Sequence, residues 1–375
     1  MFKGTPPMGW NSWNTFGENI SEDLIFQIAD TMVESGLAEH GYDYLIIDDC
    51  WGMPDRDENG CLQYNKDKFP NGMKAVADYI HAKGLKFGMY SCTGNITCIA
   101  RAGSFGHEFQ DAKTFAEWEI DYLKHDCCYK PYYQPGHLLY KRMGAAIANC
   151  GREILFHACN GGLEDAKEWI KSTGANMWRS TGDINDSWQS IKDIAFQQFD
   201  VQAYNGLNCY NDMDMLVVGM NGMGNVGLTG CTKEEYKTHF SLWAMLNSPL
   251  IIGCDIRCMS DDTKEILMNT EIININQDVA GRQPFFLNDN RDTVILAKLL
   301  NNGDFAVGLF NFSDSDVTMF LHWADLGIDR ILGKGFALRD LWSHEDIGVS
   351  GDMYRSPVIC AHGCQMLRAS LVDVI

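Results

Sequence analysis

Asp126 stands at a place in the sequence where an acidic side chain could do chemistry. It closes a short segment that begins with the strand formers Tyr122 and Leu123, and Lys124 precedes it by two positions. If the segment is a strand of a parallel barrel, Asp126 lies at the carboxyl end, where catalytic groups gather. An aspartate kept ionised by a nearby cation is a candidate nucleophile. The alternative is an aspartate that caps the next helix, and one position alone favours that alternative.

The same ending recurs along the chain, and the recurrence favours catalysis. The other aspartates that follow apolar segments are Asp48, Asp49, Asp183 and Asp214. Carboxylates gathered on one rim repel one another, so a purely structural reason for all of them is hard to find. Two chemistries use such a rim. One is a divalent-metal site as in barrel lyases, with Lys124 as base, and the other is glycoside hydrolysis by a nucleophile and an acid/base.

Aromatic residues near the same segment ends favour a sugar over a metal. Trp13, Trp51 and Tyr90 are expected at the rim, where their faces could stack on a pyranose ring. Trp10 and Trp178 are also expected there, but we interpret them as packing residues of the barrel edge.

The composition excludes several classes of protein. The 375 residues are 46% hydrophobic and 21% charged, and 30 basic against 50 acidic residues give a net charge of −20. Such a surface repels phosphate backbones and anionic lipids, so we expect no nucleic-acid and no membrane partner. No apolar run approaches the length of a membrane span. A neutral small molecule or oligosaccharide is the expected substrate, and the oligomeric state stays open, with a homo-oligomer as one option.

The amino-terminal residues and the cysteines indicate in which cellular compartment the protein is expected. The amino-terminal residues lack the apolar core of a signal peptide, which predicts a cytoplasmic protein, or a secreted one if a leader was removed. None of the 14 cysteines forms a C-x-x-C pair, so a zinc ribbon or a thioredoxin-like site is not supported. Most cysteines are expected to be reduced core residues.

Strand-like apolar segments alternate with helical patterns over about the first 280 residues. They cover residues 8–13, 44–47, 86–90, 122–126, 154–159, 177–180, 209–215 and 249–255. Apolar strands that alternate with helices predict a parallel sheet covered by helices. Eight such units have the size of a (β/α)8 TIM barrel, which makes the fold class α/β. An open doubly wound sheet is the structural alternative.

Helix signals support this division. Ser21 is the expected N-cap of the first helix, Gly84 is expected to end a helix over residues 73–83, and Thr232 with Glu235 forms a capping box. The helix after the third strand is expected over residues 111–118.

The pattern changes near residue 283, where alternating polar and apolar residues begin. The alternating segments are 293–299, 305–312, 317–322, 336–341 and 365–369. Short turns join them, which is typical of an antiparallel β-sandwich. We therefore expect a catalytic barrel over residues 1–283 and a β-sandwich domain over residues 284–375.

A glycine-rich stretch matches the dinucleotide fingerprint but lacks its context. Residues 222–227 read G-x-G-x-x-G, yet the next helix starts only at Thr232, and Asn247 stands where the fingerprint needs an acidic residue. We interpret the stretch as a flexible loop and expect no nucleotide cofactor.

Several short motifs occur in order through nearly the whole chain. They are residues 7–13 (PMGWNSW), 47–51 (IDDCW), 124–126 (KHD), Arg179 with 182–184 (GDI), 211–215 (NDMDM) and 275–278 (INQD). Together they resemble glycoside hydrolase family 27, the α-galactosidases and α-N-acetylgalactosaminidases. The resemblance implies a TIM barrel followed by an antiparallel β-domain, a retaining mechanism, and no metal or other cofactor.

Carried over position by position, the resemblance implies that Asp126 is the nucleophile and Asp183 the acid/base. A proton donor needs a raised pKa, so we expect a raised pKa for Asp183. Lys124 is implied to bind sugar hydroxyls and to help keep Asp126 ionised. Cys98 and Cys128 match a disulfide pair beside the site.

The resemblance also implies a set of sugar-binding residues. Asp48 and Asp49 are implied to bind the hydroxyls at C4 and C6, and Arg179 the C2 side. Asp214 is implied to lie near Arg179 and the acid/base. Trp13 and Tyr90 are implied to shape the pocket.

Two departures from the family pattern bear on specificity and setting. Relatives often have Cys-Glu-Trp where this chain has Cys159, Asn160 and Gly161. An asparagine can bond a 2-hydroxyl, so Asn160 is expected to bind substrate and an α-galactosidase is favoured. An α-N-acetylgalactosaminidase, a β-L-arabinopyranosidase, a metal-dependent barrel lyase and a non-catalytic sugar-binding barrel remain alternatives. Cys50 matches a disulfide-bonded family cysteine, but Glu18 stands in place of its partner, which suggests a less oxidised setting.

Overall fold

Parallel strands close into a barrel in the computed structural model, which describes residues 4–328 and 333–374. Eight strands form one sheet in the order β10-β1-β2-β3-β4-β5-β6-β8. They are β1 (Met8–Asn11), β2 (Tyr44–Ile47), β3 (Lys86–Cys92), β4 (Tyr122–Asp126), β5 (Leu155–Cys159), β6 (Met177–Arg179), β8 (Tyr210–Asp212) and β10 (Leu250–Ile252). A parallel bridge between Leu216 and Ile252 joins the two ends of the sheet. The barrel prediction is confirmed, and the open doubly wound sheet is excluded.

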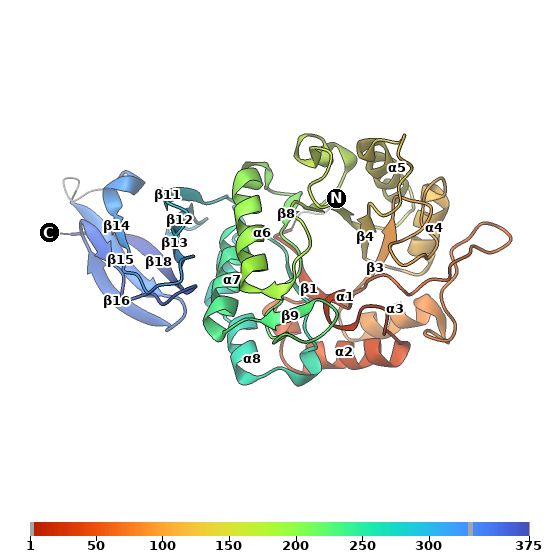
Figure 1. Ribbon diagram of the computed structural model, residues 1–375, viewed down its shortest axis with the longest axis horizontal. Helices are drawn as coiled ribbons and strands as arrows, with labels where there is room; N and C mark the ends of the chain where they lie inside the picture. Colours follow the sequence, from red (N-terminus) through yellow and green to blue (C-terminus); the bar gives the residue numbers. More distant parts are fainter. Residues whose placement is uncertain (1–3, 329–332, 375) are drawn as a thin grey trace.

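Helices surround the barrel strands (Figure 1). The principal ones are α2 (Glu22–Glu34), α3 (Gly72–Ala82), α4 (Glu108–Glu117), α5 (Gly136–Ala148), α6 (Trp188–Val201), α7 (Lys233–Met245), α8 (Asp261–Leu267) and α9 (Thr270–Asn276). A short helix α1 (Trp13–Phe16) follows β1 directly. Between β5 and β6 the connection is made by two 3-10 turns, η2 (Ala166–Glu168) and η3 (Ile170–Thr173).

The local signals explain where several helices begin and end. The Ser21 side chain accepts a bond from the backbone N–H of Leu24, and the capping box of Thr232 and Glu235 is formed in full. Gly84 has a φ of +78°, a left-handed conformation that ends α3 without a side-chain clash. The helix α5 was not predicted, because Pro135 at its N-cap offers no side-chain hydrogen bond.

The C-terminal domain is antiparallel, as predicted. Its main sheet has the order β11-β12-β13-β18-β15-β16. The strands are β11 (Phe285–Asp289), β12 (Thr293–Leu299), β13 (Phe305–Asn311), β15 (Lys334–Asp340), β16 (Glu345–Ser350) and β18 (Cys364–Asp373). The pair β14 (Phe320–His322) and β17 (Met353–Arg355) packs on this sheet through a shared apolar core. The strand β16 was not predicted, because nearly all its side chains are exposed and its apolar alternation is limited to Ile347 and Val349.

The main sheet of the C-terminal domain also packs on the barrel. Figure 1 shows this domain (blue) beside α6 and α7. Successive side chains of a strand point to opposite faces, and β12 uses both faces. Ile295 and Ala297 lie in the core of the sandwich, whereas Val294 and Leu296 lie in the core shared with the barrel.

Lys298 continues the barrel-facing row of β12 and is almost completely buried. Its ammonium donates to Asn247 Oδ1 at 2.7 Å and to the carbonyl oxygen of Ile275 at 2.8 Å. The charge thereby reaches the carboxyl ends of α7 and α9, where the helix dipole favours a cation.

Within the described ranges, no helix has both the length and the apolar character needed to span a membrane.

Candidate active site

A cavity of about 310 Å³ opens at the carboxyl ends of the barrel strands. Its lining residues are Trp13, Asn14, Asp48, Asp49, Tyr90, Cys98, Lys124, Asp126, Cys159, Arg179, Asp183, Ile184, Asn185, Asp214, Met215 and Val226. The structure thus brings together side chains that are up to 213 positions apart in the sequence (13 to 226). All five rim aspartates are among them, as the strand-end pattern indicated.

Asp126 ends β4 and is fixed by two donors. Its Oδ2 accepts from the Tyr90 hydroxyl at 3.0 Å, and its Oδ1 accepts from the backbone N–H of Cys127 at 2.7 Å. Burial raises the pKa of Asp126, while the charge of Lys124 and these hydrogen bonds act against the rise. The carboxylate is therefore held in one orientation at the floor of the cavity.

Lys124 forms its ion pair with Asp48 and not with Asp126, the carboxylate that follows it on the same strand face. The distance from Lys124 Nζ to Asp48 Oδ2 is 2.6 Å, and both side chains are buried. Asn11 donates to the same carboxylate oxygen at 2.8 Å. Burial disfavours the charged amine, but the nearby carboxylates, led by Asp48, raise the pKa of Lys124 overall. Lys124 lowers the pKa of Asp126 through its charge, as expected, without being the direct partner of that carboxylate.

Asp49 faces the same cavity as Asp48 although the two residues are adjacent. The strand β2 ends at Ile47, so both aspartates lie beyond the pleat that would separate them. Burial raises the pKa of Asp49 to about 6. Its Oδ2 is buried and accepts no hydrogen bond of ordinary geometry from the described part of the chain.

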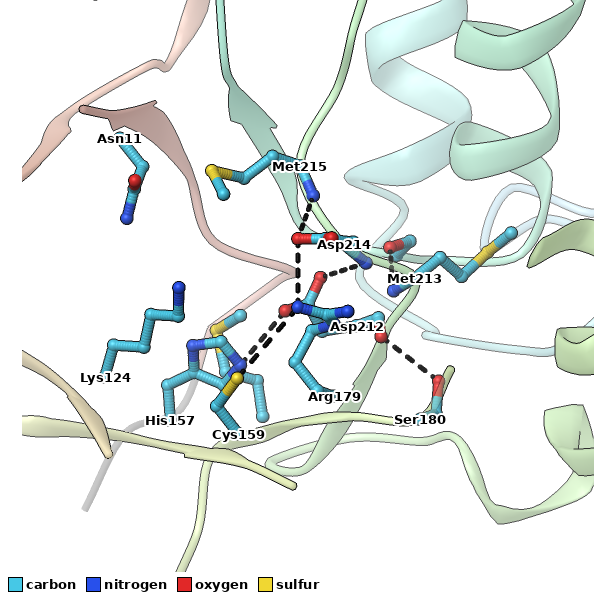
Figure 2. A network of polar contacts seen from close by, with 12 residues as sticks. Asn11, Lys124, His157, Cys159, Arg179, Ser180, Asp212, Met213, Asp214 and Met215 are labelled. Carbon is cyan, nitrogen blue, oxygen red and sulfur yellow. Dashed lines mark hydrogen bonds and ion pairs between the residues drawn. The ribbon is translucent and has the colours of Figure 1, made fainter. Parts of the chain in front are cut away.

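Arg179 ends β6 and joins two carboxylates, of which Figure 2 shows that of Asp214. Its guanidinium lies 2.9 Å from Asp183 Oδ1 and 3.1 Å from Asp214 Oδ1. The Arg179 side chain is 3% exposed, whereas the Asp183 side chain is 92% exposed and projects into the open part of the site. The Asp214 carboxylate also accepts from the backbone N–H groups of Met215 and Ile184.

The pKa of Asp183 differs from the expectation for a proton donor. The charge of Arg179 lowers the pKa of Asp183 and outweighs the opposite effect of the surrounding cavity walls, which keep part of the water away from this otherwise exposed carboxylate. The expectation of a raised pKa is wrong, because the sequence did not show that Arg179 pairs directly with Asp183.

Asn160 lies beside the site, but its amide is engaged in its own loop. The amide donates to the carbonyl oxygen of Leu163 at 3.0 Å and accepts from the N–H of Gly162 at 3.3 Å. Cys159, and not Asn160, lines the cavity next to Arg179. Two residues expected at the sugar site, Asn160 and Trp51, are not among the side chains that line the cavity.

A disulfide between Cys98 and Cys128 is present beside the site. It joins the loop that follows β3 to the loop that follows β4. The Tyr90 hydroxyl lies 3.5 Å from the Cys128 sulfur, so the residue that holds Asp126 also contacts the disulfide. Cys50 is a buried free thiol, in line with its missing family partner.

The Sγ atoms of this disulfide and a carboxylate oxygen of Asp126 lie within 4.8 Å of one another. Sulfur atoms joined in a disulfide are not thiolates and offer a metal no such ligand. This trio is therefore explained by the disulfide.

Comparison with known proteins matches both parts of the chain. Residues 5–278 match the family model described as alpha galactosidase A, and residues 290–369 match that of the alpha galactosidase C-terminal beta sandwich domain. The α-galactosidase of Cyamopsis tetragonoloba is 45% identical over 370 residues, which cover 96% of this chain and 85% of that protein.

The chain belongs to the α-galactosidase family, glycoside hydrolase family 27.

Solved structures of the family superpose on the whole chain. Alpha-galactosidase I of Mortierella vinacea is 34% identical, with a TM-score of 0.92 and coverage of 99% of this chain and 97% of that one. The Saccharomyces cerevisiae enzyme, solved with raffinose, is 29% identical, with a TM-score of 0.89 and coverage of 98% of each chain.

The aromatic residues fall into the cavity-lining and buried packing groups that the sequence indicated, with one exception. Trp13 and Tyr90 line the cavity, and Trp10 and Trp178 are buried packing residues. Trp51 is also buried, and its indole N–H donates to the carbonyl oxygen of Tyr90 at 2.9 Å. Trp51 therefore supports Tyr90 and does not line the pocket.

Several residues of the site were not predicted. Asn11 orients Asp48, Cys159 and Met215 line the cavity, and Asp212 and His157 lie beneath it. Asn11 and Asp212 stand inside the motifs quoted above, which was a usable signal. No sequence signal pointed to His157, because a histidine inside an apolar strand cannot be distinguished in the sequence from a packing residue.

The glycine-rich loop 222–227 is held on both sides. The N–H of Gly222 donates to Asp186 Oδ2 at 2.6 Å, and the N–H groups of Asn225 and Val226 bond the carbonyl oxygens of Thr15 and Asn14. Val226 reaches the cavity wall. The loop thus belongs to the sugar site, and its description as flexible was incomplete.

Proposed function

We infer that this chain is an α-galactosidase, a glycoside hydrolase that removes terminal α-linked galactose. The observation that carries this conclusion is the 45% identity to an α-galactosidase over nearly the whole chain. The cavity adds a pocket rich in carboxylates and of a size for one sugar ring. Raffinose, which was bound to the yeast relative, is a candidate oligosaccharide substrate.

The proposed mechanism is a double displacement that retains the anomeric configuration. The ionised carboxylate of Asp126 attacks C1 of galactose, while the protonated carboxyl of Asp183 gives its proton to the leaving glycosidic oxygen. A water molecule then attacks C1 of the glycosyl-enzyme, and Asp183 takes a proton from that water. The C1–O bond to Asp126 breaks, and both carboxyl groups return to their starting states. Support comes from the fixed orientation of Asp126 and from the open position of Asp183.

The sugar hydroxyls are assigned to the remaining carboxylates. Asp48 and Asp49 are proposed to accept hydrogen bonds from the 4-hydroxyl and 6-hydroxyl, with Lys124 donating to the same hydroxyls. The buried Oδ2 of Asp49 accepts no hydrogen bond of ordinary geometry from the described residues, although Thr97 and the backbone of Ile99 lie close enough to lower the pKa of this carboxyl, and the open acceptor supports the assignment. Trp13 and Tyr90 would shape the walls, and the loop of Cys98 would border the entrance.

The C2 side is assigned to Arg179 and Asp214. We give Asn160 an indirect role, because its amide already bonds Leu163 and Gly162. The choice between galactose and N-acetylgalactosamine then depends on the space beside Cys159 and Arg179.

The domain boundary is proposed at residues 283 and 284, between the end of α9 at Asn276 and the start of β11 at Phe285.

A panel of nitrophenyl glycosides tests the function. We expect the highest kcat/KM for the α-galactoside, lower values for the α-N-acetylgalactosaminide and the β-L-arabinopyranoside, and activity that survives a chelator. Proton NMR of the first product should show α-galactose. A clear advantage for either alternative sugar would replace the galactose assignment, an inverted product would refute the mechanism, and loss of activity with the chelator would favour a metal-dependent reaction.

A further inference from the structure

The backbone of Asp214 is in an unusual conformation. Its φ is +76°, in the left-handed region that residues other than glycine rarely adopt. The N–H of Asp214 donates to Asp212 Oδ1 at 2.9 Å, and its carbonyl oxygen accepts from the indole N–H of Trp243 at 2.8 Å. Such strain persists only where surrounding contacts enforce it. Here the conformation aims the Asp214 carboxylate at Arg179.

A buried chain of polar side chains stands behind Asp212. The other oxygen of Asp212, Oδ2, lies 3.0 Å from His157 Nε2, and His157 Nδ1 lies 2.7 Å from the Tyr122 hydroxyl. The three residues come from β8, β5 and β4 and are 4%, 3% and 1% exposed. None of them lines the cavity. Figure 2 shows His157 and Asp212 beside Arg179, below the wall that carries Asp214.

Groups from three barrel strands face Asp183. Arg179 lies on β6, Lys124 on β4, and Asp214 follows β8. The thiols of Cys127 and Cys159 are also close enough to feel the Asp183 charge. Arg179 lowers the pKa of Asp183, and the same guanidinium is shared with Asp214. If Asp214 moved away, the whole charge of Arg179 would act on Asp183 and its pKa would fall further.

We propose that Tyr122, His157 and Asp212 are positioning residues for the hydrolysis reaction, because they hold Asp214 against Arg179 and so leave Asp183 able to accept a proton. The proposal rests on the proposed role of Asp183 as the acid/base. The chain does not touch substrate. It acts through the left-handed backbone of Asp214, which Asp212 fixes and which His157 and Tyr122 in turn keep in place.

Two variants and one control test the chain. Tyr122→Phe removes a hydroxyl with little change of shape, and His157→Leu removes the partner of Asp212. The control is Tyr42→Phe, which removes another fully buried hydroxyl whose bond, to the carbonyl oxygen of Leu267, lies away from the site. Each variant is assayed for kcat and KM on nitrophenyl α-galactoside across pH, and the crystal structure of Tyr122→Phe is determined.

The expected result is a move of the basic limb of kcat/KM to lower pH, because the reaction needs protonated Asp183. The shift should be about 0.5 pH unit for His157→Leu, a fraction of the 1–3 units that a close opposite charge produces. Tyr122→Phe should shift the limb in the same direction by less, and kcat should fall more than KM rises. The variant structure should show Asp214 displaced from Arg179. Tyr42→Phe should leave the limb in place.

Three outcomes would contradict the positioning role, the linkage to Asp214 or the role of Asp183, respectively. If Tyr122→Phe lowers only thermal stability, as Tyr42→Phe does, and the limb is unmoved, the chain is merely structural. If Asp214 keeps its conformation in the variant crystal, the proposed linkage is wrong even where activity changes. If Asp183→Ala leaves the basic limb of the wild-type pH profile unchanged, Asp183 is not the acid/base and the proposed function fails at that point. The crystal structure of Tyr122→Phe then still decides whether Tyr122, His157 and Asp212 hold Asp214 in place.

Discussion

The Arg179 guanidinium lies 2.9 Å from the Asp183 carboxylate, so the proposed proton donor is paired with a buried cation. The same guanidinium lies 3.1 Å from Asp214. Arg179 is therefore positioned both to bind the sugar and to set the protonation of Asp183. A general acid acts only while it is protonated, so this pairing bears directly on the pH range of activity.

Replacing Arg179 with glutamine should move the basic limb of kcat/KM to higher pH. The charge of Arg179 lowers the pKa of Asp183, so its loss raises that pKa and keeps the acid protonated at higher pH. The shift should be about 1 pH unit, at the lower end of the effect of a close opposite charge. The measurement is kcat/KM against pH with nitrophenyl α-galactoside. Arg257→Gln, which breaks an ion pair with Asp255, is the control. An unchanged limb in Arg179→Gln contradicts the pairing.

Replacing Asp126 with glycine should lower kcat by about 10⁴-fold or more, the scale seen when a nucleophile is removed. Azide should enter the vacated space, partly restore cleavage and form β-galactosyl azide, which mass spectrometry and NMR identify. Asp255→Gly, a change at an aspartate outside the cavity, should retain activity. Near-native turnover of Asp126→Gly without azide would show that another group attacks C1.

Replacing Asp183 with alanine should affect substrates unequally. Nitrophenolate leaves without a proton, whereas the sugar alkoxide released from raffinose needs one. The loss in kcat/KM should be about 10²–10⁴-fold larger for raffinose than for nitrophenyl α-galactoside, the range of general acid catalysis. Steady-state kinetics on both substrates provide the test, and equal losses on both would refute the role.

Wild-type enzyme should prefer nitrophenyl α-galactoside over α-glucoside by about 10⁴-fold in kcat/KM, since a site built around a hydroxyl rejects analogues that misplace it. Asp48 is paired with Lys124, whereas a buried oxygen of Asp49 accepts no hydrogen bond of ordinary geometry from the described residues. Asp49→Asn should therefore reduce the ratio of kcat/KM for the α-galactoside to that for the α-glucoside. Thermal unfolding checks that the variant keeps its fold. An unchanged ratio would remove Asp49 from the recognition of the sugar.

The buried Lys298 should make stability depend on pH. Burial lowers its pKa to about 7 in the folded protein, whereas an unfolded lysine titrates near pH 10.4. Between these values the unfolded chain binds more protons, so this group makes unfolding harder as pH rises. From pH 7 to pH 9 the free energy of unfolding of wild type relative to Lys298→Met should rise by about 2 kcal/mol at most. Denaturant titrations at both pH values measure it, and parallel curves would contradict the pKa shift.

Much of the fold was determined by local patterns. Apolar segments that each end in a polar loop predicted the barrel strands, and the caps at Ser21 and Thr232 predicted two helix starts. Strand β16 and helix α5 were not predicted, because the alternation in the exposed strand is limited to two apolar residues and the proline N-cap of the helix offers no side-chain hydrogen bond. The motif around Asp126 and that around Asp183 predicted which aspartates meet at the cavity.

The partners within the site were decided only by the tertiary structure. The sequence places Lys124 two residues from Asp126, yet its ammonium pairs with Asp48, 76 positions away. The sequence predicted that Asn160 binds a hydroxyl of the sugar, but its loop turns the amide onto the carbonyl oxygen of Leu163. Sequence spacing determines which face of a strand a side chain occupies. The partner it meets there depends on the register of neighbouring strands and on the loop backbone beyond them, as the left-handed Asp214 and its buried supports His157 and Tyr122 show.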